Sequence, residues 1–370
     1  MPGYRLALAS VSLVFFLAAC TAPASAPSEP IAPLESAVFA GNCTLSGPLR
    51  VYNWFEYMDP AVLTQFGERY GIEVTEELYG SNEEMINTLK EKPGTYDLIF
   101  PGGFAVPLLI EEGLIQELDR ENIPNEGNLS TVLRPLYDTL NRYSMPYQWG
   151  ITGIAYNASY FDKAPDSWAY FFEPELAGAH EGTITMLDDK RETLAAALIY
   201  LGYSVNDTNP GHLEEARDLL LSQQPYLAGY VSEGLTQQLI EGEIQLAHNW
   251  NGYTAAAGAQ NPDIKFIVPK EGAVMFLDKV AIPTDAPNKC TAELFINYIL
   301  DPQIAAQISN FTLYNPPVPA ASAFLNPAAQ AMLELSYNSE TFNDLQVIEH
   351  PTDPTTYDSV WQEVKGGLDE

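Results

Sequence analysis

Acidic and aromatic side chains stand together at two places in the sequence. Four aromatic residues accompany the carboxylate of Glu56 within residues 52–57, and Phe276 stands two residues before Asp278. Carboxylates pair with ammonium groups, and the faces of aromatic rings attract cations and cover the methylene groups between them. This mixture suits a ligand whose ammonium groups are joined by methylenes, although any single one of these aromatic side chains is more often part of a protein core.

The stretch 52–57 follows the first strand of a predicted α/β unit. Short apolar runs predict strands, apolar residues at helical spacing predict helices, and a capping box at Ser81 and Glu84 marks one helix start. In order, these signals predict a strand at 49–52, a helix at 60–70, a strand at 72–78, a helix at 81–90 and a strand at 97–100. The βαβαβ order indicates a mostly parallel sheet with helices on its faces, where ligands bind beyond the carboxyl ends of strands.

The alternation of strands and helices returns in the second half of the chain. Further strands are predicted at 184–187, 244–247, 266–268 and 280–283, and further helices at 193–201, 292–300, 302–309 and 359–366. Behind the N-terminal segment the chain keeps about 350 residues, more than one domain usually holds. Two α/β domains are therefore the simplest packing of these elements.

The N-terminal segment has the pattern of a bacterial lipoprotein signal. Arg5 precedes an apolar run at 6–17, and the run ends in Leu-Ala-Ala before Cys20. We expect residues 1–19 to be a signal peptide and Cys20 to carry lipid, followed by a disordered, proline-rich tether to residue 48. An ordinary secretory signal with a chance Cys20 is the alternative. Either signal places the rest of the chain outside the cytoplasm.

The charge balance excludes some classes of ligand. The chain has 49 acidic and 17 basic residues, a net charge of −32. Phosphate recognition needs clustered Lys and Arg, so we do not expect this protein to bind nucleic acid. A cationic ligand would be attracted by this field, although a generally acidic surface, as in salt-adapted organisms, explains most of the charge. Cys43 and Cys290 are candidates for a disulfide in an exported protein, and the sequence leaves their pairing open.

The sequence lacks the common catalytic and metal-binding motifs. It contains no G-x-S-x-G elbow, P-loop, H-E-x-x-H or dinucleotide glycine pattern, and its four histidines lack the spacing of zinc ligands. We therefore expect no catalysis, no metal and no cofactor. The acidic residues Asp188, Asp189 and Glu192 could serve a glycosidase, so a surface-anchored sugar hydrolase stays open as a rival.

Several segments occur in an order and spacing that resemble one family. They are VYNWFEYMDP at 51–60, SNEEM at 81–85, YDLIFPGGF at 96–104, YSMPYQWGITGIAYN at 143–157, LDDKRE at 187–192, EGEIQLAHNWNG at 241–252, VPKEGAVMFLDKVAIP at 268–283 and WQEVK at 361–365. The chain resembles the substrate-binding proteins of bacterial polyamine ABC importers, the spermidine/putrescine-binding family. The resemblance covers residues 49–366, nearly all of the mature chain.

The resemblance implies a two-lobed periplasmic-binding-protein fold with the ligand in a cleft between two α/β lobes. Each lobe is then discontinuous, with lobe 1 at 49–155 and 277–320 and lobe 2 at 156–276 and 321–370. The residues that match the family's ligand contacts, together with Phe55 beside them, are Trp54, Phe55, Glu56, Tyr57, Phe104, Asp189, Glu192, Trp250, Phe276, Asp278, Tyr314 and Gln362.

Some positions depart from the family's pattern and bear on ligand choice. Phe55 stands where a small hydroxyl residue is usual, Gly102 replaces a serine, and Phe104 replaces a tyrosine. Tyr253 stands where putrescine-selective relatives resemble one another in carrying an aspartate. Four candidate acids exceed the two charges of putrescine, and unpaired carboxylates in a closed cleft are costly. We therefore expect spermidine to be preferred, with putrescine possible.

The sequence thus predicts a monomeric, lipid-anchored receptor on the periplasmic or extracellular face of a bacterium. It would capture a polyamine and deliver it to an ABC permease without catalysing a reaction. A receptor for another small cationic or amino compound is the nearest alternative, and a carbohydrate-active lipoprotein is the more distant one.

Overall fold

The described part of the chain opens with the expected βαβαβ unit. The computed structural model describes residues 44–131, 133, 137–138, 140–337, 344–350 and 353–366. The unit consists of β1 (Leu49–Trp54), α1 (Pro60–Tyr70), β2 (Val74–Tyr79), α2 (Asn82–Glu91) and β3 (Leu98–Ile99). Ser81 caps α2, since its hydroxyl accepts the N–H of Glu84 at 3.1 Å. Local capping and hydrophobic spacing therefore place these elements within a few residues of their predicted bounds.

All strands of the described chain join one sheet. The remaining strands are β4 (Ser144–Asn157), β5 (Ile184–Met186), β6 (Leu227–Tyr230), β7 (Leu246–Trp250), β8 (Ile264–Ile267), β9 (Ala273–Ala281) and β10 (Leu345–Gln346). The order is β2-β1-β3-β9-β4-β7-β5-β6, with β10 beside β9 and β8 beside β4. The strands at the two ends pair in parallel, as expected, whereas β4 pairs antiparallel with β7, β8 and β9.

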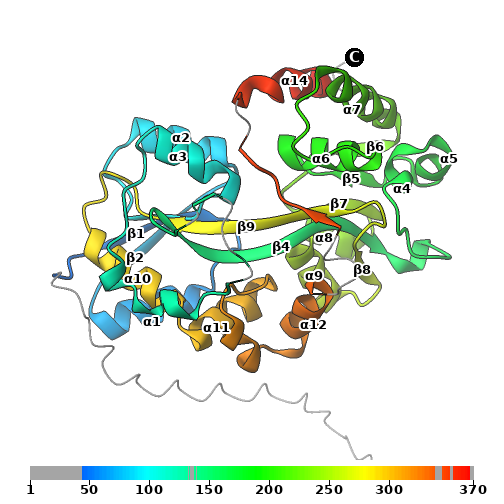
Figure 1. The fold of residues 1–370 in the computed structure, drawn as a ribbon. Coiled ribbons are helices and arrows are strands. Elements are labelled where there is room, and N and C mark those ends of the chain that lie inside the picture. The colour runs from blue at the N-terminus through cyan, green and yellow to red at the C-terminus, as the bar shows by residue number, and fades with distance from the viewer. Residues whose placement is uncertain are drawn as a thin grey trace, which may run out of the picture. The chain divides into compact units, whose positions relative to one another are not determined.

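The long strands β4 and β9 run through the middle of the sheet and connect its two ends (Figure 1). Their register extends from Ser144 opposite Ala281 to Thr152 opposite Val274, with an irregularity beyond Pro146. Within β4, only Tyr156 is not fully buried. A strand buried on both faces lacks the alternation of polar and apolar residues, which explains why the sequence did not predict it.

Helices cover both faces of the sheet at each end (Figure 1). At one end α2 lies on the opposite face from α1 and α11, and at the other end α6 and α7 lie opposite α9. The further helices are α3 (Val106–Glu111), α4 (Ala169–Phe172), α5 (Pro174–Ala177), α6 (Lys190–Tyr200), α7 (Pro210–Gln223), α8 (Leu235–Glu241), α9 (Asn251–Gln260), α10 (Lys289–Ile299), α11 (Pro302–Thr312), α12 (Pro327–Ser336) and α14 (Asp358–Gly366).

Each end of the sheet has a hydrophobic core of its own. One core packs Tyr52 and Ile99 of the first strands against Met85 of α2. The other packs α6 against β5 and β7, with Leu198 and Leu246 fully buried. Separate cores are what define separate lobes, so the two-lobed α/β fold is confirmed. The predicted lobe boundaries near residues 155 and 276 stay a prediction, because β4 and β9 belong to both ends of the sheet.

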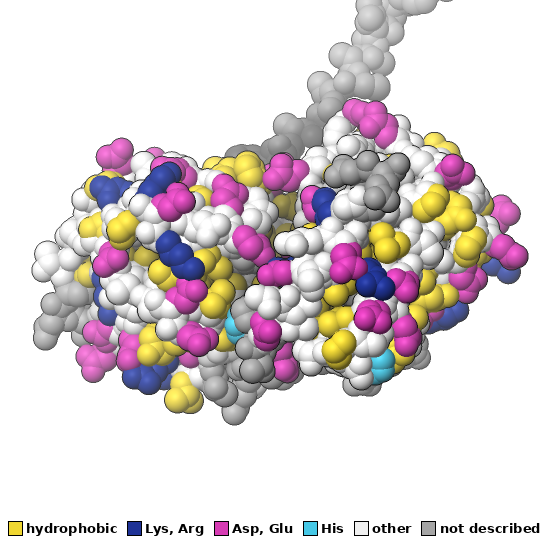
Figure 2. Space-filling model, turned by 90° about the horizontal axis from the view of Figure 1, so that it is seen from above, with side chains coloured by type: hydrophobic (Ala, Val, Ile, Leu, Met, Phe, Trp, Pro, Cys, Tyr) yellow, Lys and Arg dark blue, Asp and Glu magenta, His cyan; other side chains and the backbone are white. Residues whose placement is uncertain are grey.

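The acidic side chains are spread over the surface. Figure 2 shows Asp and Glu scattered over the face it presents, with Lys and Arg between them, which favours a generally acidic surface. Within the described residues, no helix combines the length and apolar character needed to cross a membrane. The predicted signal peptide, Cys20 and Cys43 lie outside the described residues. Cys290 is disulfide-bonded. Its predicted pairing with Cys43 stays a prediction, because Cys43 is not among the described residues.

Candidate ligand-binding site

A cavity lies between the two ends of the sheet, over β9 and beside the starts of α6 and α9. It holds about 690 Å³ that no protein atom fills, part of it open to solvent, which is within the usual range of ligand pockets. Nine of the twelve residues expected to bind ligand line it: Trp54, Tyr57, Phe104, Asp189, Glu192, Trp250, Phe276, Asp278 and Tyr314. The fold therefore brings these residues together in one cavity, although they lie far apart in the sequence.

Three of the expected residues do not line this cavity. Phe55 is 45% exposed, and Glu56 adopts a left-handed backbone conformation with φ of 51° in the turn after β1. Gln362 lies on α14 and faces a neighbouring chamber. The direction of a turn residue or of one helical side chain depends on the backbone around it, which a matched motif does not specify.

Several residues line the cavity although they were not among the expected contacts. Asn82 accepts the N–H of Gly102 at 2.9 Å through its side-chain oxygen and so holds the loop after β3. It lies inside the resembling segment 81–85, which was the signal that could have identified it. Tyr137 and Ile348 lie in stretches without a recognised motif, and the sequence gave no signal for them.

Asp278 is the acid that the middle of the sheet contributes to the cavity. It lies inside β9, opposite Gln148 on β4, whereas the predicted strand began only at residue 280. The hydroxyl of Tyr57 donates a hydrogen bond of 2.7 Å to the Asp278 carboxylate. Burial raises the pKa of Asp278 to about 7, although the hydrogen bonds from Tyr57 and the Gly103 backbone oppose the shift. A cation beside this carboxylate would therefore strongly favour its ionised form.

Two further acids stand at the start of α6. Asp189 is the N-cap, and its side chain accepts the backbone N–H groups of Arg191 at 2.9 Å and Glu192 at 3.0 Å. Burial, followed by the charge of Asp189, raises the pKa of Glu192 to about 8. One carboxylate oxygen of Glu192 has no hydrogen-bond partner within the described residues. Buried polar atoms normally have partners, so a ligand ammonium that reached this oxygen would satisfy it.

Aromatic rings form the walls between these acids. Tyr314 makes edge contacts with Tyr57 and Phe276, at ring distances of 5.4 and 5.5 Å, and lies 6.0 Å from Tyr253. The indole N–H of Trp54 donates to the carbonyl of Phe100 at 2.7 Å, which fixes the plane of that ring. The rings are therefore held in place before any ligand binds, which reduces the entropy lost on binding.

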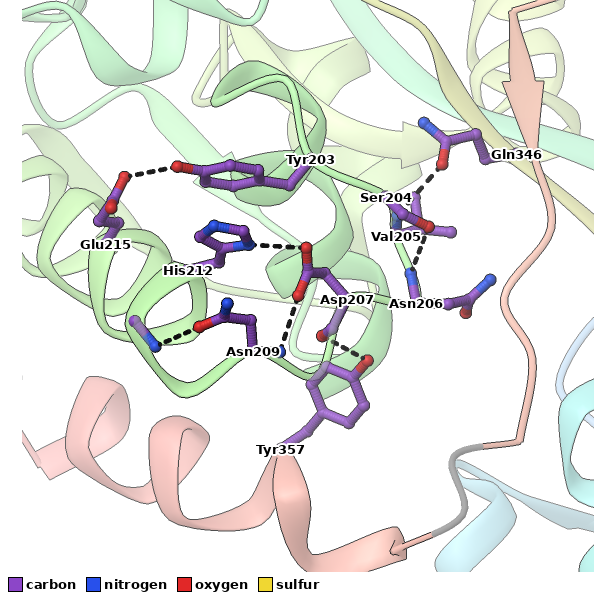
Figure 3. A network of polar contacts seen from close by, with 11 residues as sticks. Tyr203, Ser204, Val205, Asn206, Asp207, Asn209, His212, Glu215, Gln346 and Tyr357 are labelled. Carbon is purple, nitrogen blue, oxygen red and sulfur yellow. Dashed lines mark hydrogen bonds and ion pairs between the residues drawn. The ribbon is translucent and has the colours of Figure 1, made fainter.

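The C-terminal segment adds β10 beside β9 and places Ile348 on the cavity wall. Figure 3 shows how neighbouring parts of this segment are held by the loop after α6. The side-chain oxygen of Gln346 accepts the N–H of Val205 at 3.1 Å, and the hydroxyl of Tyr357 donates to the carbonyl of Asp207 at 3.0 Å. These contacts fix the position of the wall.

Arg191 joins the two acids of α6 to the C-terminal segment. Its guanidinium donates to the carbonyl of Glu349 at 3.1 Å and to the side chain of Asn206 at 3.2 Å. It also lies over the ring of Tyr357, 4.0 Å from the ring centre. Because Arg191 directly precedes Glu192, these contacts set the orientation of the first turn that carries the site's acids.

The cavity thus combines three buried or part-buried carboxylates with fixed aromatic rings. This arrangement can pair with several positive charges while ring faces cover an apolar chain between them. The described residues include no cluster of three or more histidine, cysteine or acidic side chains placed to hold a metal ion. The fold and the cavity define a two-lobed binding protein.

Comparisons with known proteins agree with this class. Residues 61–334 match the bacterial extracellular solute-binding protein family, and the chain belongs to that family. It is 35% identical over 328 residues to the spermidine/putrescine-binding periplasmic protein of Escherichia coli K12, which covers 86% of this chain and 92% of that protein.

Two solved structures are also similar to this chain. A putative spermidine/putrescine ABC transporter from Listeria monocytogenes superposes with a TM-score of 0.80 and 31% identity, over 86% of this chain and 98% of that chain. A lipoprotein of Treponema pallidum superposes with a TM-score of 0.76 and 26% identity, over 85% of this chain and 98% of that chain.

Proposed function

We propose that this protein captures a linear polyamine outside the cytoplasm and delivers it to an ABC permease, without catalysing a reaction. The observation that carries the proposal is the cavity in which Asp189, Glu192 and Asp278 stand among fixed aromatic rings. Lobes that both contact the ligand favour a closed state once it is bound. The names of the relatives in E. coli and L. monocytogenes support the same ligand class.

Spermidine is the preferred ligand in this proposal. Glu56 does not line the cavity, so three acids rather than four remain to pair with ligand charges. Spermidine carries three ammonium groups and leaves none of these carboxylates unpaired, whereas putrescine carries two. An unpaired carboxylate in a closed cavity raises the free energy of the complex, because a desolvated charge needs a partner.

A carbohydrate-active protein is the weaker candidate. Of the acids that suggested it, Asp188 is exposed and pairs with Lys365 at 2.9 Å, and it does not line the cavity. One carboxylate oxygen of Asp189 accepts two backbone N–H groups, which makes this residue the N-cap of α6. Neither side chain is therefore placed as the free acid or base that glycoside hydrolysis requires.

Calorimetric titration of the purified protein with putrescine, cadaverine, spermidine, spermine and a panel of sugars tests the proposal. We expect heat with the amines, spermidine binding most tightly, and none with the sugars. If the folded protein gives no heat with any amine, the proposed function is wrong. If putrescine displaces spermidine at equal concentration, polyamine binding stands but the charge-matching argument fails.

We also propose that the protein acts as a monomer, held at the membrane by lipid on Cys20. The Leu-Ala-Ala-Cys ending and the similarity to a lipoprotein of T. pallidum support this anchor. Cys20→Ser should abolish incorporation of labelled fatty acid and release the protein from, or stall it at, the membrane. Membrane retention of the wild type with its signal peptide intact would instead indicate an N-terminal anchor helix.

A further inference from the structure

A second chamber adjoins the ligand cavity. It holds about 950 Å³ free of protein atoms and shares the walls Trp54, Phe104, Asp189 and Trp250 with the cavity. Its remaining walls come from the starts of α2 and α6 and from α14, including Gln362. A linear ligand that passes these shared rings would enter the second chamber.

The second chamber repeats the chemistry of the first, with acids beside an indole. Three of its four carboxylates, those of Glu83, Asp188 and Asp358, already pair with ammonium groups of the chain itself. Lys190 Nζ lies 2.5 Å from Asp358 Oδ1 and 3.6 Å from Glu83 Oε1. Lys365 Nζ lies 2.9 Å from Asp188 Oδ1, and it also lies over the ring of Trp361, 5.7 Å from the ring centre.

We propose that Lys190 determines ligand length, because its ammonium group takes the place that the fourth ammonium of a longer polyamine would occupy. The inference rests on the proposed polyamine function. With Lys190 on Asp358 and Glu83, a terminal ammonium entering the chamber finds these carboxylates paired and meets a positive charge. A triamine places its three charges at the three carboxylates of the inner cavity, whereas a tetraamine carries one more charge and extends past the shared rings into the second chamber. The chain therefore selects shorter polyamines by supplying the last cation itself.

Lys190 also lies between the two lobes. Glu83 belongs to α2 in the lobe that contains β1, whereas Lys190 and Asp358 start α6 and α14 in the other lobe. Removing the ammonium group therefore takes away one contact between the lobes, and this loss should weaken the binding of all ligands alike. The gain for a tetraamine is specific, so the ratio of two affinities separates the two effects.

Lys190→Met keeps the length of the side chain and removes its charge. We expect the ratio of spermine affinity to spermidine affinity, measured by calorimetry on the whole protein, to rise about fivefold, near the upper end for one part-exposed ion pair. Lys90→Met is the matched control. Lys90 lies on α2, pairs with Glu112 at 2.6 Å and lines neither chamber. In the control the ratio should stay at the wild-type value.

A second substitution identifies the group that receives the extra charge. Asp358→Asn in the Lys190→Met background should reverse the gain for spermine, because it removes the carboxylate that Lys190 leaves free. Lys190→Gln replaces Lys190→Met if the latter does not fold. Wild-type protein that binds no amine refutes the proposed function. If the wild type binds spermidine but the ratio of spermine affinity to spermidine affinity is unchanged in folded Lys190→Met, the proposed role of Lys190 is wrong and the polyamine function stands.

Discussion

Polyamine binding should release protons from the cavity. Burial raises the pKa of Asp278 to about 7 and that of Glu192 to about 8, so both side chains hold part of a proton at neutral pH when the cavity is empty. An isolated alkyl ammonium group titrates at about pH 10, so the terminal ammonium groups of a polyamine stay charged over this range. A bound ammonium favours the ionised carboxylate, so each carboxylate that pairs with the ligand gives up its proton.

The magnitude follows from the pKa of Asp278. About a tenth of this side chain is ionised at pH 6 and about nine-tenths at pH 8, so Asp278 alone should raise the affinity about tenfold between these pH values. Glu192 adds to the increase because its pKa is higher. Tyr57 donates to Asp278 and reduces the shift.

Calorimetry in two buffers of different ionisation enthalpy measures the released protons directly. We expect the binding heat to depend on the buffer, and the dissociation constant for spermidine to fall steadily from pH 6 to pH 8. Asp278→Asn should reduce the number of released protons and flatten the pH dependence. Equal heats in both buffers, together with equal affinities at pH 6 and pH 8 in folded protein, would refute the reasoning.

Three further predictions concern the same residues. At pH 8, Asp278→Asn should weaken spermidine binding at least tenfold, because removing one partner of a buried charge pair costs roughly 2–5 kcal/mol; an unchanged titration curve would place Asp278 outside the site. Gly103→Ala should lower the melting temperature and the free energy of unfolding by about 1–3 kcal/mol, because its Cβ would lie 2.3 Å from the carbonyl of Leu277; Gly127→Ala, which has open space, is the control. Without ligand, the free energy of unfolding should fall as pH rises from about 4 to about 8, because Asp278 and Glu192 keep protons in the folded state that the unfolded chain has lost. Denaturant titrations should show a smaller fall in the Asp278→Asn variant. An equal fall in the variant and the wild type would contradict this cause.

Local signals in the sequence were enough for elements that carry their own caps. The helix at 60–70 has its predicted bounds, because Asp59 accepts the N–H of Ala61 at 2.9 Å and Pro60 suits the first turn. The helix predicted from residue 193 begins at Lys190, since the Asp189 cap lies further upstream than the apolar run. This earlier start places Glu192 in the first turn, beside the ligand cavity.

Elements that depend on distant partners were not predictable in the same way. β4 is defined by its pairing with β7, β8 and β9 rather than by a periodic pattern. β9 begins at Ala273, seven positions before the predicted strand, and this extension carries Phe276 and Asp278 into the sheet. Burial on two faces removes the alternation by which β4 would be recognised. In β9 the charged residues Asp278 and Lys279 interrupt the apolar run, so only its last residues carried a strand signal.

The resemblance supplied most of the site where local patterns did not. It matched acidic and aromatic residues from both ends of the chain. The order of the matched segments along the sequence made the resemblance specific. It could not specify the conformation of the turn after β1, where the carbonyl of Phe55 accepts the hydroxyl of Tyr253 at 3.1 Å and Glu56 adopts a positive φ. Nor did it indicate Tyr137, which meets the C-terminal segment only in the folded chain.

The pairing of β4 with β9 also orders the folding of the chain. Residues 49–99 form contacts with near neighbours, so this unit can fold early, whereas Ser144 must wait for Ala281, which is made much later. Contacts between distant residues close large loops and form slowly. A chain that stops before Ala273 leaves β3 and β4 each with an unpaired edge. Such open edges are the surfaces through which incomplete sheets associate, so truncated chains should aggregate instead of yielding separate lobes.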